Sequence, residues 1–281
     1  MVTREEWTRD TPWRQGHLLP HEAIKSLGLT HPKYPDDTLV IVASHDCDLA
    51  QLPDNEPSIE IVFGHRIHVL DGNNTHAKSS RTLHLRFEGD DPLLAEFVIT
   101  NKRSISKYAL IAFIPVAEFK LSSAGLSIFQ RWLASRYRRS AFLDEFENRL
   151  KNTGLAGRIA KAVKPHGELI TAVFFDVDEG EEILRNGPDD IYVLDIVLLY
   201  ATEPDFNAAA LAANKAKEVI EDAFRTKLFD NQSKKWRNIE LRYVDTISEE
   251  ALSYRQFTLM KPWRIEHISL GADPQQPILA E

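Results

Sequence analysis

The stretch Thr38-Leu-Val-Ile-Val-Ala43 is apolar and mostly β-branched, and the polar stretch Ser44-His-Asp-Cys-Asp48 follows it directly. β-branched residues favour strands, so these residues predict a buried strand with a polar turn at its carboxyl end. Similar short runs, separated by Pro, Asn, Asp and Gly clusters, follow at 59–63, 82–87 and 96–100. Several short strands at this spacing predict a small β-barrel or sandwich over residues 1–117.

Residues 118–165 have a helical pattern and a local excess of positive charge. Phe129 and Leu133 are four residues apart, which places them on one face of a helix. Between Lys120 and Lys164 the chain has ten Lys and Arg against three Asp and Glu, a balance of +7. We therefore expect a basic helical connector between two domains.

Residues 166–281 are predicted to form a second unit. Apolar runs predict strands at 169–175, 191–201, 239–244, 251–259 and 263–268. An alanine-rich helix starts after Asp205, which can cap it, and ends near Leu228. This order favours an antiparallel sheet with a packed helix, and the fold class of the whole chain is α+β.

Composition excludes several classes of protein. Lys and Arg number 34 against 42 Asp and Glu, and a net charge of −8 argues against a protein that coats DNA or anionic membrane. The single cysteine excludes an internal disulfide and a multi-cysteine zinc site. No apolar run reaches the roughly 18 residues of a membrane span, and the N-terminus lacks the apolar core of a signal peptide. These features predict a cytoplasmic protein without a membrane partner.

The turn at 44–48 holds the densest chemistry. Asp46 and Asp48 share one face if the strand continues, and Glu60 in the next predicted strand adds a third carboxylate. Such a set of oxygen ligands fits a divalent cation such as Mg²⁺. In the structural alternative, both aspartates bond backbone amides of the turn.

The same turn offers a nucleophile. Cys47 could act as a thiolate, with His45 or His65 as the base that a thiolate needs nearby. In the structural alternative, Cys47 is a small buried apolar group.

Two features of the C-terminal unit suggest metal chemistry less directly. The acidic stretch 176–182 could hold Mg²⁺ or form an exposed turn. Glu240 and Arg242 give Glu-x-Arg on a predicted strand, one substitution from the Glu-x-Lys of metal-dependent nucleases.

Four segments carry a family resemblance: Trp13-Arg-Gln-Gly-His-Leu-Leu19, Leu39-Val-Ile-Val-Ala-Ser44, Ile59-Glu-Ile-Val-Phe-Gly64 and Phe97-Val-Ile-Thr-Asn-Lys-Arg-Ser-Ile-Ser-Lys107. Their order over residues 12–115 resembles that of the PemK/MazF toxin family, small SH3-like barrels that cut RNA without a metal. The resemblance implies an SH3-like barrel and ribonuclease activity.

This sequence departs from the family pattern at two places. Pro35-Asp-Asp37 stands where the family usually has Arg-Pro before its second strand. The position of the family's catalytic Thr or Ser falls around Gly64-His65-Arg66, where either of the last two residues could substitute chemically.

A predicted helix is the best candidate for binding nucleic acid. This helix lies in the run Arg131-Trp-Leu-Ala-Ser-Arg-Tyr-Arg-Arg-Ser-Ala-Phe-Leu-Asp144. The run resembles uncharacterised bacterial proteins to which no activity is attached, and so does the stretch Ser44-His-Asp-Cys-Asp-Leu49. The run starting at Arg131 mixes aromatic rings with guanidinium groups, which suit base stacking and phosphate contact. The predicted phosphate-binding residues are Arg131, Arg136, Arg138 and Arg139. The alternative is an amphipathic connector whose arginines meet the acidic C-terminal unit.

Together these observations predict a bacterial protein of toxin or phage-defence type that acts on RNA or DNA, most specifically a ribonuclease. Its site would combine the turn His45, Asp46, Cys47 and Asp48 with His65, Arg66, Arg103 and Lys107. Histidine would move protons and arginine would bind phosphate. The first rival is a non-catalytic module that binds a protein or small ligand. The second is a metal-dependent hydrolase that uses Asp46, Asp48 and Glu60.

Overall fold

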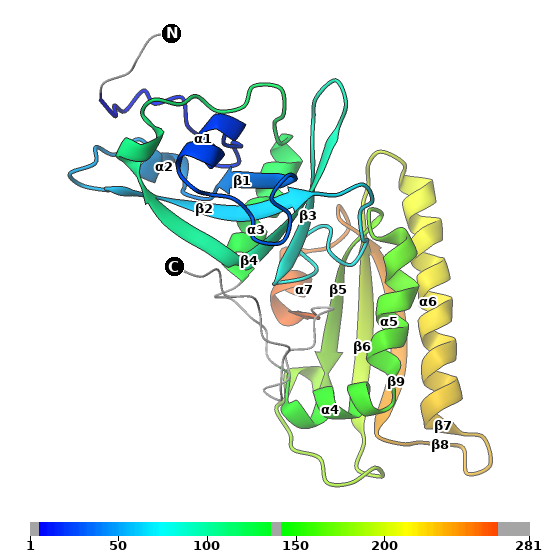
Figure 1. The fold of residues 1–281 in the computed structure, drawn as a ribbon. Coiled ribbons are helices and arrows are strands. Elements are labelled where there is room, and N and C mark those ends of the chain that lie inside the picture. The colour runs from blue at the N-terminus through cyan, green and yellow to red at the C-terminus, as the bar shows by residue number, and fades with distance from the viewer. Residues whose placement is uncertain (1–5, 136–141, 264–281) are drawn as a thin grey trace. The chain divides into compact units, whose positions relative to one another are not determined.

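The computed structural model describes residues 6–135 and 142–263, and the chain divides into two compact units (Figure 1). Among the described residues, unit 1 comprises 6–70 and 80–135, and unit 2 comprises 71–79 and 142–263. The predicted helical connector is therefore divided: its first helix belongs to unit 1, and the rest belongs to unit 2. No helix among the described residues is long and apolar enough to cross a membrane.

Unit 1 is built on an antiparallel four-stranded sheet with the strand order β1-β2-β4-β3. Its elements are α1 (His21–Ser26), β1 (Thr38–Val42), α2 (Asp46–Leu49), β2 (Ser58–Arg66), β3 (Thr82–Phe87), β4 (Leu93–Ser106), the 3-10 turn η1 (Lys107–Leu110) and α3 (Ser123–Ser135). The predicted strands are confirmed. β-branched and aromatic side chains on β1 and β2 form a core with α1, including Val40, Val42, Ile61 and Phe63.

The described strands of unit 1 form an open sheet and not a closed barrel, because β1 and β3 lie at opposite ends of the strand order and do not pair. Short backbone contacts extend both edges. Leu18 pairs with Ile41 of β1, and its carbonyl also accepts the N–H of Val116. At the other edge, Lys120 exchanges two backbone hydrogen bonds with Glu88, directly after β3. The segment between residues 116 and 120 thus reaches both edges of the sheet.

Unit 2 has a four-stranded sheet with the order β10-β5-β6-β9 and a separate two-stranded ribbon. Its elements are α4 (Asp144–Asn152), α5 (Leu155–Val163), η2 (Lys164–His166), β5 (Ile170–Val177), η3 (Asp178–Gly180), β6 (Tyr192–Tyr200), α6 (Phe206–Leu228), β7 (Phe229–Asp230), β8 (Lys235–Trp236), β9 (Ile239–Ser248), α7 (Tyr254–Leu259) and β10 (Lys261–Pro262). Helices α5 and α6 run side by side along the sheet (Figure 1). Their apolar faces share one core with β5, β6 and β9.

Two predictions for unit 2 are wrong, whereas the strands predicted at 169–175, 191–201 and 239–244 and the long helix are confirmed. The strand predicted at 263–268 lies outside the described residues except for residue 263. The sheet is mixed and not antiparallel, because the long helix α6 carries the chain back across the sheet and β9 runs parallel to β6. Residues 254–259 are helical and not extended, because Ser253 and Gln256 form a capping box that starts α7. The helix after Asp205 is confirmed, and the Asp205 carboxylate accepts the N–H of Ala208 at its start.

Candidate functional site

The polar turn that follows β1 is a helical turn, α2, and its polar side chains point to solvent. Residues 45–48 are all exposed. His45 is the N-terminal cap, and its Nδ1 accepts the N–H of Cys47 at 3.2 Å. Because successive helical residues are about 100° apart, Asp46 and Asp48 point in different directions and do not share a face. The shared face that a continuing strand would have produced is absent.

Two of the three predicted metal ligands are engaged elsewhere. Asp46 accepts the backbone N–H of Gln15 at 2.8 Å, and Glu60 is ion-paired with Lys102 at 2.7 Å. Over the described residues, no group of three or more His, Cys, Asp or Glu side chains is arranged to hold a metal ion. Cys47 is an exposed free thiol, so the buried alternative for this residue is wrong.

The two halves of the predicted catalytic site lie at opposite ends of β1. His65 of β2 pairs with Thr38, the first residue of β1, whereas the polar turn follows the last residue. Six residues separate Thr38 from Ser44, which at the usual strand rise is roughly 20 Å. His65 therefore does not meet Cys47 as a base.

His65 belongs instead to a row of polar side chains that crosses all four strands. Thr38 of β1 pairs with His65 of β2, His65 pairs with Glu96 of β4, and Glu96 pairs with His84 of β3. Directly paired residues project from the same face of a sheet. His84 Nε2 and Glu96 Oε2 are 2.8 Å apart. We call these four residues the polar row.

The loop before β1 places two further rings beside the polar row. Tyr34 stacks on His65 with 3.8 Å between ring centroids, and the His31 ring lies 5.7 Å from His65. Thr38 fixes this loop: its hydroxyl oxygen accepts the N–H of His31 and bonds the carbonyls of Tyr34 and Pro35. His31 Nδ1 accepts two backbone N–H groups, from residues 33 and 34, so a neutral His31 carries its proton on Nε2.

Burial sets the protonation of this cluster. It lowers the pKa of His31, and the nearby His65 lowers it further. Burial also lowers the pKa of His65, although the Glu96 carboxylate opposes that shift. The hydrogen bond from His84 lowers the pKa of Glu96, so that side chain stays ionised. At neutral pH the cluster therefore combines the neutral imidazoles of His31 and His65 with the negative charge of Glu96.

The predicted phosphate-binding residues have different surroundings. Arg103 lies over the Phe63 ring, 5.3 Å from its centroid, on the face of the sheet that carries His65. Lys107 is fully buried, and its Nζ donates to the carbonyls of Asp48 and Gln51 at 2.6 and 2.8 Å. It therefore holds the end of α2 and cannot reach a phosphate.

Two of the remaining predicted arginines are exposed on different elements of unit 1, and three are not described. Arg66 and Arg131 are both exposed, on β2 and α3. Arg136, Arg138 and Arg139 lie outside the described residues.

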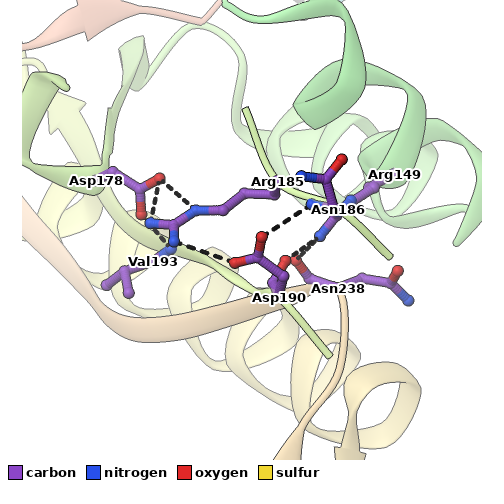
Figure 2. A network of polar contacts seen from close by, with 7 residues as sticks. All are labelled: Arg149, Asp178, Arg185, Asn186, Asp190, Val193 and Asn238. Carbon is purple, nitrogen blue, oxygen red and sulfur yellow. Dashed lines mark hydrogen bonds and ion pairs between the residues drawn. The ribbon is translucent and has the colours of Figure 1, made fainter. Parts of the chain in front are cut away.

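In unit 2 the acidic stretch after β5 is part of an internal ion-pair network (Figure 2). Asp178 accepts the N–H of Val193 at 2.9 Å and is ion-paired with Arg185 at 3.0 Å. Arg185 also reaches Asp190, whose carbonyl accepts a hydrogen bond from Arg149. Because its carboxylate is satisfied from inside the protein, Asp178 closes a loop and is unsuited to hold Mg²⁺.

The Glu-x-Arg pattern on β9 is explained in a similar way. Arg242 donates to both carboxylate oxygens of the buried Asp195, with 2.9 Å between Nε and Oδ1, and also bonds Glu179. The arginine thus neutralises Asp195, in a place where a nuclease lysine would face solvent and substrate.

Sequence reasoning selected His65 but gave no role to Glu96, His31 or Tyr34. Only the alternation of polar and apolar residues around Glu96 could have indicated that it faces His84 and His65. Comparison of the chain with protein-family profiles, with curated proteins and with solved structures found no match to any of them.

Proposed function

We propose that this protein acts on nucleic acid as a toxin or phage-defence protein and that it cleaves RNA without a metal at the polar row. The observation that carries the proposal is His65, a partly buried imidazole stacked on Tyr34 and paired across the strand with the ionised Glu96. A base that is neutral at pH 7 and has a carboxylate beside it is suited to accept a proton.

In this proposal His65 takes the proton of a ribose 2′-hydroxyl. The 2′ oxygen then attacks the adjacent phosphorus, and the bond from phosphorus to the 5′ oxygen breaks. The leaving oxygen takes a proton from water, which gives a 2′,3′-cyclic phosphate and a 5′-hydroxyl. Glu96 stabilises the positive charge that forms on His65. Arg103 projects from the same face but pairs with Ile61, four residues from His65 along β2, so in this proposal it binds a phosphate farther along the RNA.

An SH3-like arrangement, in which loop segments and not strand pairing join the edges of the open sheet, is also part of the proposal. The backbone bonds of Val116 to Leu18 and of Lys120 to Glu88 support it, because one segment spans from the β1 edge to the β3 edge. The resemblance over residues 12–115 supports the same reading.

The test is cleavage of end-labelled RNA in EDTA by wild type, by His65→Ala and by His45→Ala. His45 is a matched control because it is an exposed imidazole at the other end of β1. We expect cleavage by wild type, a loss of about 10²–10⁴-fold in His65→Ala, and little change in His45→Ala. RNA with 2′-deoxyribose at the cleavage site should resist. Failure of folded wild type to cleave any RNA, or equal loss in both variants, would refute the proposal.

A further inference from the structure

Unit 1 contains a cavity on the side of β1 that faces away from β2. The cavity has a volume of about 600 Å³, within the range of about 300–1,000 Å³ in which proteins hold ligands. Its apolar lining comes from separate parts of the chain and includes Leu18, Ile24, Leu39, Leu93, Ile114 and Val116. Ile114 is 72% exposed, so the cavity opens to solvent beside a large apolar side chain.

The cavity shares one residue, Thr38, with the polar row and lies beside the other face of the sheet. Side chains alternate between the two faces of a sheet, so Leu39 and Arg66 project away from the face that carries Thr38 and His65. A ligand in the cavity would therefore not occupy the proposed cleavage site.

A backbone edge faces the cavity. Asp37 and Ala43 bond β2 through their backbones, whereas Val40 and Val42 bond the segment at 16–19 on the other side. By this alternation the N–H and carbonyl of Thr38 also point away from β2, toward the cavity. The segment that pairs with β1 stops there, because the next residue is Pro20, which has no N–H to donate.

The charges around the cavity favour a basic occupant. Asp36, Asp37 and Glu118 line it, and among the described lining residues Arg66 is the only Lys or Arg. Both aspartates are exposed, so their carboxylates are available to a ligand. Three carboxylates against one guanidinium give the lining a formal charge of about −2. This charge complements a ligand with positive charges beside an apolar centre.

We propose that this cavity binds an extended peptide segment of a partner protein, in which two or three apolar side chains are flanked by Lys or Arg. The apolar side chains fill the cavity, and the peptide backbone bonds Thr38. The flanking cations meet Asp36 and Asp37. Strand addition of this kind takes its affinity from main-chain bonds and its specificity from side-chain pockets.

The experiment measures binding of two fluorescent probe peptides, Lys-Leu-Val-Leu-Lys and Glu-Leu-Val-Leu-Glu, to the full-length protein by anisotropy. We expect the basic peptide to bind with a Kd below about 1 mM and the acidic peptide to bind at least about tenfold more weakly. No binding of the basic peptide at 1 mM, or equal binding of both peptides, would overturn the proposal.

Two pairs of variants locate the binding. The double variant Asp36→Asn/Asp37→Asn should bind the basic peptide about fivefold or more weakly than wild type does. The double variant Asp90→Asn/Asp91→Asn should bind it with unchanged affinity. The second pair is matched because it is an equally exposed Asp-Asp outside the cavity. Ile114→Arg should block binding, and Val69→Arg, at a 77% exposed apolar residue elsewhere, should not. Equal effects within either pair would show that the peptide binds outside the cavity.

Discussion

The two ends of β1 differ in how they gather reactive groups. At the carboxyl end, four polar or reactive residues adjoin in sequence, yet α2 spreads their side chains into solvent. At the amino end, His31, Tyr34, His65, His84 and Glu96 are distant in sequence, and strand pairing brings them together. Reactive residues that are close together in the sequence therefore need not have side chains that meet in the folded protein. Convergence depends on which residues are paired across strands.

The largest effect on stability should come from the residue that fixes the turn end. Lys107→Met keeps the apolar stem but removes a charged donor that bonds the carbonyls of Asp48 and Gln51. We expect the free energy of unfolding to fall by about 3 kcal/mol, measured by urea denaturation, because two acceptors lose a charged donor. Lys102→Met, which breaks only the partly exposed pair with Glu60, should cost less than about 1 kcal/mol. Equal losses would show that Lys107 does not anchor α2.

The second-largest loss of stability should come from the Glu96 carboxylate, at the centre of the polar row. Glu96→Gln removes the charged partner of His84 and should cost about 2 kcal/mol. Glu96 has a lowered pKa in the folded protein, so its contribution is complete above the ordinary glutamate pKa and is lost as the pH falls through the folded value. The difference in the free energy of unfolding between wild type and Glu96→Gln should therefore disappear at acid pH. Glu88→Gln, on the exposed end beyond β3, is the control and should show neither effect.

The stacked ring of Tyr34 should contribute less to the free energy of unfolding than the Glu96 carboxylate does. Tyr34→Ala should lower the free energy of unfolding by about 1 kcal/mol, because His65 loses its stacking partner, and Tyr34→Phe should retain it. Tyr108→Ala, at a 61% exposed tyrosine, is the matched control. A loss in Tyr34→Phe as large as in Tyr34→Ala would point to the hydroxyl and not the ring.

The buried imidazoles should make stability depend on pH. Burial lowers the pKa of His31 and His65, so the folded state binds fewer protons than the unfolded state. Stability is then complete above the ordinary histidine pKa and falls as the pH drops through the lowered folded values. Urea denaturation from pH 7.5 to 5.5 should give a flatter slope for His65→Gln than for wild type. A slope unchanged in His65→Gln, or equally flattened in the exposed His21→Gln, would contradict this assignment.

The smallest effect should come from the most reactive-looking residue of the turn. Cys47→Ser should change the free energy of unfolding by less than about 0.5 kcal/mol, since the thiol is exposed. RNA cleavage should also be unchanged. A loss of cleavage in Cys47→Ser would move the site to the carboxyl end of β1.

The sequence by itself determined the elements whose signals are local. The β-branched run at 38–43 is β1, and the alanine-rich run after Asp205 is α6 with the predicted cap. Such patterns depend on side-chain shape and on contacts within a few residues, so they are legible along the chain. The same reasoning selected His65 for the candidate site.

Only the tertiary structure decided which of these elements meet. The parallel pairing of β9 with β6, the burial of Lys107 against α2 and the row from Thr38 to His84 all join residues far apart in sequence. Strand order and register depend on how apolar faces are buried and on how backbone groups find partners across the whole unit. A shift of one residue in register would turn His65 away from Glu96, so no local pattern could fix the site.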